Sequence, residues 1–212
     1  MWTLSRLRRY LRRIVVGSLA KVLLRCQGVE FGAGLVLHSF PVCRRSRGAR
    51  IKLGSNVTIN NKIDENPAGI AHRTVLAAVG EKAELSIGNN VGISGAVLFC
   101  ACRITIEDHV NIGAGVKIYD TDFHPIGAMA RRANDMSQIK TAAVRICHDA
   151  WLGADSMILK GVVIGARSIV AARAVVVKDV PEDCVVAGVP AHIVARLDQE
   201  PNEASRVPRV VT

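Results

Sequence analysis

The stretch ICHDAWLGADSMILKGVVIGARSIVAARAVVVKDV, residues 146–180, repeats a six-residue pattern without interruption. A branched aliphatic residue opens each unit, in the series Ile146, Leu152, Ile158, Ile164, Val170 and Val176. The fifth residue of each unit is small or branched. Because residues an even number apart in an extended chain point to the same side, positions one and five share a face. A unit of six is too short for a helix-turn-helix or for a hairpin with its own core. The period therefore predicts an all-β solenoid of short strands that coil and stack.

The same pattern occurs earlier in the chain, in residues 53–63, 87–97 and 106–122. Residues 64–84 do not fit it, and the rhythm is lost again after His124 until about Val144. We therefore expect a β-helix domain over residues 29–190, with an excursion loop at about 125–143. Residues 1–28 are expected to form a basic helical segment, and residues 191–212 a C-terminal extension.

Composition limits the kinds of partner that the chain can have. It has 212 residues, enough for one domain of ordinary size, and a formal net charge of +10. Residues 1–52 carry twelve Lys or Arg and one acid, whereas residues 53–212 carry sixteen Lys or Arg and seventeen acids. Because the repetitive body is nearly neutral, we expect no nucleic-acid partner. The six cysteines include no CxxC pair. They are interpreted as reduced core residues of a cytoplasmic protein that requires no metal.

The N-terminal segment is predicted to be a basic amphipathic helix. Leu4, Leu7, Leu11, Ile14 and Val15 recur at helical spacing opposite arginines. The apolar run is broken by Lys21, is too short to span a bilayer and precedes no A-x-A-like cleavage site. Two interpretations remain open. The stripe packs on the body of this protein or of a neighbour, or the helix lies on an anionic membrane surface, which would place the protein at the inner face of the membrane.

The stretch DTDFHP, residues 120–125, stands where the repeat breaks. Histidine is suited to general base chemistry because its unperturbed pKa is near neutral pH. Asp120 and Asp122 would share a face with His124 if the strand continued that far, and either acid could orient the imidazole or bind acceptor hydroxyls. The alternatives are a solvated turn histidine and an Asx-type turn. In the excursion loop, Arg131 either binds an anionic acceptor or solvates the loop.

Four stretches together resemble the hexapeptide-repeat acyltransferases, over roughly residues 85–196. They are IGNNVGISGAV, IEDHVNIGAGVKIYDTDFHP, WLGADSMILKGVVIGARSIV and VVVKDVPEDCVVAGVPAHIV. The nearest branch looks like the sugar O-acetyltransferases of the maltose and galactoside type and their relatives in polysaccharide biosynthesis. The resemblance implies a left-handed parallel β-helix and a homotrimer with acetyl-CoA between neighbouring subunits. It also implies acetyl transfer to a hydroxyl of a sugar or cell-surface glycan. Transfer to an amino sugar, a serine-type hydroxyl or a xenobiotic remains an alternative.

The resemblance also implies roles for individual residues. His124 matches the catalytic histidine. From their positions near His124 rather than from the resemblance, Asp122 is expected to assist it, and Asp120 and Arg131 to contact the acceptor. Ser94 stands where these enzymes place an acceptor-binding Asn.

For the cofactor, the resemblance assigns Trp151 to the pantetheine groove, and Gly153, Ala154 and Ala172 to positions where the backbone approaches acetyl-CoA. Lys178 matches a lysine that meets the CoA phosphates. The chain departs from the pattern at His192, Ala195 and Arg173, and either Arg196 or Arg167 would compensate.

Two other classes compete with this interpretation. A γ-type carbonic anhydrase needs three histidines on zinc, two of them close in one coil. Here His109, His124 and His148 are too widely spaced. A non-catalytic β-helix scaffold would not need the DTDFHP, WLG and KDVP stretches together.

Overall fold

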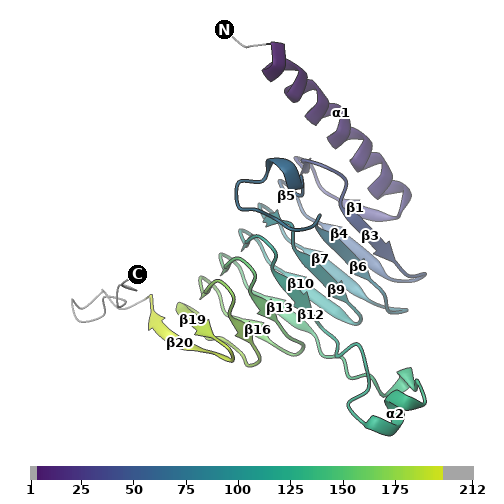
Figure 1. The fold of residues 1–212 in the computed structure, drawn as a ribbon, viewed down its shortest axis with the longest axis vertical. Helices are drawn as coiled ribbons and strands as arrows, with labels where there is room; N and C mark the ends of the chain where they lie inside the picture. Colours follow the sequence, from purple (N-terminus) through teal and green to yellow (C-terminus); the bar gives the residue numbers. More distant parts are fainter. Residues whose placement is uncertain (1–3, 198–212) are drawn as a thin grey trace, which may run out of the picture.

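The computed structural model describes residues 4–197, with side chains from residue 15 onward apart from that of Glu65. The chain forms a coil with three flat sides, which we call sheets A, B and C, and a helix stands at its N-terminal end (Figure 1). Neighbouring strands within a sheet are mostly three strands apart in sequence, because each coil contributes one strand to each side. This arrangement is the β-solenoid that the six-residue period predicts.

Each sheet runs along one side of the coil, and its strands follow one another in this spatial order. Sheet A contains β1 (Val29–Phe31), β4 (Arg50–Leu53), β7 (Glu84–Ile87), β10 (Arg103–Ile106), β13 (Val144–Ile146) and β16 (Val163–Ile164). Sheet B contains β2 (Val36–Leu37), β5 (Thr58–Asn60), β8 (Gly92–Ser94), β11 (Asn111–Ile112), β14 (Trp151–Leu152), β17 (Ile169–Val170), β19 (Cys184–Gly188) and β20 (Ala191–Arg196). Sheet C contains β18 (Val175–Val176), β15 (Met157–Ile158), β12 (Lys117–Tyr119), β9 (Val97–Cys100), β6 (Val75–Ala78) and β3 (Val42–Arg45).

The coil ends in a hairpin. β19 continues sheet B in parallel with β17, and β20 pairs antiparallel with β19. Residues 191–196, which the sequence placed in a C-terminal extension, are therefore part of the last sheet. Residues 198–212 of that extension lie outside the described residues.

The interior of the coil is filled by the residues that open the repeat units. Leu152, for example, pairs with Ile112 on one side and Val170 on the other, and all three are buried. The fifth residue of each unit is also buried, including the hydroxyl residues Ser156 and Ser168. Replacing one such aliphatic side chain by Ala is expected to cost about 2–5 kcal/mol of stability.

The corners between sheets require a left-handed backbone conformation. In three successive coils the corner from sheet A to sheet B holds Asn90, His109 and Asp149, with φ of 57°, 62° and 60°. Asn, Asp and His are the side-chain-bearing residues that tolerate this region best. Arg173, at a corner where related chains are expected to carry Gly, also has a left-handed φ of 61°.

Two excursions leave the coil. The first, residues 61–74, contains the 3-10 helix η1 (Ile63–Glu65) and separates β5 from β6. It accounts for residues 64–74, which do not fit the repeat, and it also contains residues 61–63, which the six-residue period had included. Residues 75–84 contain β6 and the start of β7. The second follows β12 and contains α2 (Ala128–Arg132) and η2 (Met136–Gln138). It projects from the body of the solenoid (Figure 1).

Helix α1 (Leu4–Cys26) lies against the first coil. Gly17, Ala20 and Leu24 form its buried side. A Cβ atom at Gly17 would lie 2.9 Å from the carbonyl oxygen of Leu37, so this close approach requires glycine. Within the described residues, no helix has the length and hydropathy needed to cross a membrane. The predicted stripe can be placed only at Val15, which is exposed, because its other four side chains lie outside the described residues.

Candidate active site

His124 lies in the segment that leaves β12 for the second excursion, and its side chain is exposed. The residue before it, Phe123, has a φ of 62°. This left-handed conformation is unusual for a bulky residue and is maintained only where surrounding contacts enforce it. The ring of Phe123 packs on Phe99 and Tyr119, with ring centroids 4.7 Å and 5.1 Å apart. Since these two rings belong to β9 and β12, sheet C fixes the point from which His124 projects.

Asp122 contacts a residue that the sequence did not single out. Its Oδ1 atom lies 2.7 Å from the ammonium nitrogen of Lys160, which follows β15 in the next coil. Its Oδ2 atom is buried and has no hydrogen-bond partner among the described residues. The backbone amide of His124 donates to the carbonyl oxygen of Asp122 at 2.7 Å, which tightens the turn. Asp122 thus carries one ion-paired oxygen and one free oxygen beside His124 in the chain.

Asp120 is fully buried, unlike Asp122. Its Oδ1 atom accepts from the amide of Ala101 at 2.6 Å, and its Oδ2 atom accepts from the amides of Cys102 and Arg103 at 2.8 Å each. These contacts close the corner between β9 and β10, so they favour a structural role for Asp120 over the acceptor contact expected from the sequence. Burial raises the pKa of the Cys102 thiol, and the Asp120 carboxylate adds to this effect.

Arg131 braces the excursion rather than extending away from it. Its Nη1 atom donates to the carbonyl oxygen of Pro125 at 2.9 Å and also to that of Ile126. The guanidinium therefore ties α2 to the two residues after His124. This is a loop-positioning contact, and it leaves the other guanidinium nitrogens of Arg131 available for an acceptor.

A second group of predicted residues lies on the outer face of sheet B. A hollow of about 290 Å³ there is lined by Thr58, Asn60, Gly92, Ile93, Ser94, Asn111, Ile112, Gly113 and Trp151. Ser94 and Trp151 are the two predicted site residues in it, and the Trp151 side chain is 52% exposed. Because Gly92 and Gly113 have no side chains, the floor of the hollow is backbone at these two positions. Asn60 and Asn111 add amide groups that the sequence did not indicate.

The small residues predicted to face the cofactor lie beside this hollow, where sheet B turns into sheet C. A Cβ atom at Gly153 would lie 2.6 Å from the amide nitrogen of Ala172, so stacking of adjacent coils requires Gly153. Ala154 and Ala172 are exposed, which leaves the backbone accessible at this corner. Lys178 is exposed after β18, and Arg196 is exposed at the end of β20.

Arg167 is bound within the protein. It donates to Asp183 and to Glu182, with a distance of 3.0 Å to the Glu182 Oε2 atom. These hydrogen bonds raise the pKa of Arg167 and lower that of Asp183. Of the two arginines considered for the CoA phosphates, Arg196 is therefore the one whose guanidinium is not engaged by an acid in the described part of the chain.

The predicted residues form two groups on different sides of the prism. His124 and Asp122 belong to the loop that packs on sheet C, whereas Ser94 and Trp151 belong to sheet B. A single chain therefore does not bring the two groups together.

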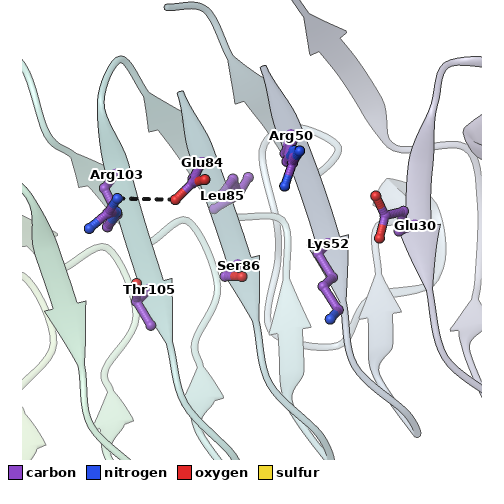
Figure 2. Close-up of a pocket in the computed structure, with 8 residues that line it drawn as sticks. All are labelled: Glu30, Arg50, Lys52, Glu84, Leu85, Ser86, Arg103 and Thr105. Atoms are coloured by element: carbon purple, nitrogen blue, oxygen red, sulfur yellow. Dashed lines mark ion pairs between the residues drawn. The ribbon is translucent and has the colours of Figure 1, made fainter. Parts of the chain in front are cut away.

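The outer face of sheet A carries a different kind of hollow, of about 420 Å³ (Figure 2). Charged side chains from successive strands surround it, among them Arg50, Lys52 and Glu30, and an ion pair of 3.2 Å joins Arg103 to Glu84. None of the residues predicted for catalysis or cofactor binding lines it. Within the described residues, no group of three His, Cys, Asp or Glu side chains has the arrangement of a metal site.

Comparison with known proteins is consistent with this fold. Residues 143–178 match the family described as bacterial transferase hexapeptide (six repeats). Galactoside O-acetyltransferase of Escherichia coli is 26% identical over 168 residues, which is 73% of this chain and 80% of that protein. The Lactococcus lactis galactoside O-acetyltransferase is 34% identical over 95 residues, or 45% of this chain and 44% of that protein. A tetrahydropyridine-dicarboxylate N-acetyltransferase of Clostridium perfringens is 46% identical over 59 residues, covering 28% of this chain and 25% of that protein. The chain thus spans less than half the length of the latter two relatives.

Solved structures show the same architecture. A hexapeptide-repeat acetyltransferase from Vibrio cholerae, complexed with acetyl-CoA, has a TM-score of 0.58 at 24% identity and covers 92% of this chain and 87% of that one. The N-acyltransferase AntD from Bacillus cereus, in complex with dTDP and 3-hydroxybutyryl-CoA, has a TM-score of 0.61 at 17% identity, with 83% and 87% covered. The fold is a left-handed parallel β-helix, and the chain, whose residues 143–178 match the hexapeptide family, is similar in sequence to acetyltransferases.

Proposed function

We propose that this protein transfers an acetyl group from acetyl-CoA to a hydroxyl of a sugar or glycan precursor. The similarity to two galactoside O-acetyltransferases supports this reaction class. The observation that carries the proposal is the exposed His124, which projects from a turn whose left-handed Phe123 is held by two aromatic rings. An accessible imidazole on a turn held in this way can meet a substrate hydroxyl.

In the proposed mechanism His124 is the general base. A neutral imidazole nitrogen takes the proton of the acceptor hydroxyl as its oxygen attacks the thioester carbonyl carbon. The tetrahedral intermediate then collapses, the carbon–sulfur bond breaks, and the imidazolium returns the proton to the CoA sulfur. The free Oδ2 atom of Asp122 would accept the second imidazole N–H, which fixes the tautomer that the base needs. Acetyl-CoA, as the cosubstrate, supplies the activated acyl group.

The donor is proposed to lie along sheet B and its corner with sheet C. The exposed indole of Trp151 would pack on the pantetheine arm. The small residues Gly153, Ala154 and Ala172 would leave room for this arm at the corner between sheets B and C. Lys178 and Arg196, both exposed cations, would meet the CoA phosphates. No metal is needed for these steps.

A homotrimer would unite the two parts of the site. His124 on the sheet C side of one subunit would face the sheet B hollow of the next, which contains Ser94 and Trp151. The outer face of sheet C supports such packing because it presents apolar side chains, among them Phe99, Met157 and Val175, that are half-buried in one chain. The outer face of sheet A, by contrast, is lined with charges.

The acceptor is proposed to be a sugar because the sheet B hollow offers short polar side chains. Ser94, Asn60 and Asn111 provide hydroxyl and amide groups that both donate and accept hydrogen bonds, as sugar hydroxyls do. An amine acceptor is the second candidate, since the Clostridium relative is an N-acetyltransferase and AntD is an N-acyltransferase.

A CoA-release assay with a panel of sugars, amino sugars and lipid-linked saccharides tests the reaction. We expect His124→Ala to lower turnover by at least about a hundredfold while the oligomer stays intact. His148→Ala removes another exposed histidine and serves as the matched control. Near-normal turnover of His124→Ala would contradict the assignment of the base. Absence of acetyl-CoA binding in calorimetry would contradict the enzyme itself and favour a scaffold.

A further inference from the structure

Helix α1 has two opposite sides in the described residues. Gly17, Ala20 and Leu24 are spaced by three and four residues and are buried against the first coil. Within the described residues, this contact shows which side of the helix the body of the protein covers. The side that it does not cover is apolar.

Val15, Leu19 and Val22 form this uncovered side. Their exposed fractions are 56%, 54% and 58%, among the highest of the large hydrophobic side chains in the described part of the chain. Their spacing of four and three residues places them in one row, about half a turn around the helix from the buried row. Leu23 borders the row and is 51% exposed. We call Val15, Leu19, Val22 and Leu23 the apolar stripe.

The charge near the apolar stripe indicates what kind of surface the stripe binds. The sequence of α1 contains seven Lys or Arg and no acid. The first 52 residues have twelve basic residues against the single acid Glu30, whereas the rest of the chain has almost equal numbers. Positive charge is therefore concentrated at the end of the molecule that carries the stripe. Apolar side chains beside a dense positive charge match a surface that is anionic at its boundary and apolar beneath it.

The geometry of α1 points to contact along a membrane surface and not to insertion across it. Neither α1 nor any other helix within the described residues can span a bilayer. The helix stands at the N-terminal end of the solenoid and extends beyond the coils (Figure 1), so a flat surface can approach it. We infer that the apolar stripe of α1, with the basic residues of the same helix, docks this protein on a bilayer containing anionic phospholipids.

Vesicle sedimentation with the purified full-length protein tests this inference. The vesicles contain phosphatidylcholine alone, or phosphatidylcholine and phosphatidylglycerol in equal parts. We expect the protein to pellet with the anionic vesicles at low salt and to be released in large part at high salt, because Lys and Arg supply much of the attraction. Val22→Glu should reduce the bound fraction at least about fivefold, since it places a charge in the interfacial layer.

Val79→Glu is the matched control. Val79 is 45% exposed at a corner of the coil, far along the chain from α1, and the substitution changes charge and volume equally. It should pellet like the wild type. Thermal unfolding and sedimentation velocity of all three proteins, without vesicles, establish that fold and oligomeric state are unchanged.

Three results would overturn the inference. The wild type could fail to pellet with anionic vesicles, or Val22→Glu could pellet as well as Val79→Glu. As a third possibility, Val22→Glu could have a lower oligomeric mass than the wild type and Val79→Glu. The apolar stripe would then be a contact with a second copy of the chain. The first two results do not bear on acetyl transfer, because α1 contains no residue of the proposed site.

Discussion

The Nζ atom of Lys160 lies 2.7 Å from the Oδ1 atom of Asp122, across one coil of the solenoid. Both side chains are largely buried, with exposed fractions of 29% and 23%. The pair joins the segment that carries His124 to the rigid stack beneath it. Asp122 therefore anchors the loop through one oxygen, and in the proposed mechanism its other oxygen would orient the imidazole.

Lys160→Met should lower kcat by about 10- to 100-fold, because a base displaced by about 1 Å loses catalysis of that order. Acetyl-CoA affinity should change little, since Lys160 lies away from the sheet B hollow. Lys160→Arg keeps the charge and should restore most of the activity. A steady-state comparison of kcat and KM for the three proteins measures this. Equal loss in the Met and Arg variants would argue against a role for the ion pair.

Asp120 and Asp122 should respond differently to the same substitution. Asp120→Asn removes an acceptor from part-buried backbone amides and turns an NH2 group toward an N–H donor, which should cost about 2–4 kcal/mol of stability. Asp122→Asn should lower activity with a much smaller change in stability. Urea denaturation and the CoA-release assay separate the two effects. A stable and inactive Asp120→Asn protein would instead indicate that Asp120 contacts the acceptor.

The sequence predicted the coil accurately because a six-residue period constrains every interior position. Ile146 and Leu152, for example, are both buried as expected. The period is lost over residues 64–84 and wrongly includes residues 61–63, because residues 61–74 leave the coil and residues 75–84 return to it as β6 and the start of β7. The sequence also placed Asp120 and Asp122 on one face with His124, since alternation assumes an extended chain. β12 ends at Tyr119, and the chain then turns, so the two carboxylates have different surroundings.

Phe123 tests whether backbone conformation at the turn matters for activity. Phe123→Gly removes the ring contacts with Phe99 and Tyr119, worth about 0.5–1.5 kcal/mol each, but relieves the strain of a left-handed φ. We expect the melting temperature to shift by only a few degrees and kcat to fall about tenfold or more, because His124 is then less well fixed. Phe123→Tyr retains the ring and is the control. Full activity of the Gly variant would exclude a positioning role for the ring.

The ion pair of Arg167 with Asp183 should make stability depend on pH. Hydrogen bonding to Arg167 lowers the pKa of Asp183, so folding favours its ionised form. Such a contribution is present above the unfolded pKa of about 3.9 and is lost as pH falls through the lower folded value. Arg167→Gln should therefore melt below the wild type at pH 7, with a difference that shrinks as pH drops below about 4. A difference that persists at pH 2 would assign the effect to packing.

Trp151 provides a direct optical test of the cofactor groove. The chain has two tryptophans, Trp2 and Trp151, so a Trp2→Phe protein reports from Trp151 alone. The indole is 52% exposed, and CoA lying along sheet B should change its fluorescence in a saturable way. Trp151→Ala should weaken acetyl-CoA binding by about tenfold in calorimetry, because an aromatic contact with the pantetheine arm is lost. Trp151→Phe keeps an aromatic ring, so its affinity for acetyl-CoA should lie between those of the wild type and Trp151→Ala. If acetyl-CoA binds with unchanged affinity to Trp151→Ala, the donor lies on another face of the prism, and the pairing of sheet B with the neighbouring His124 falls with it.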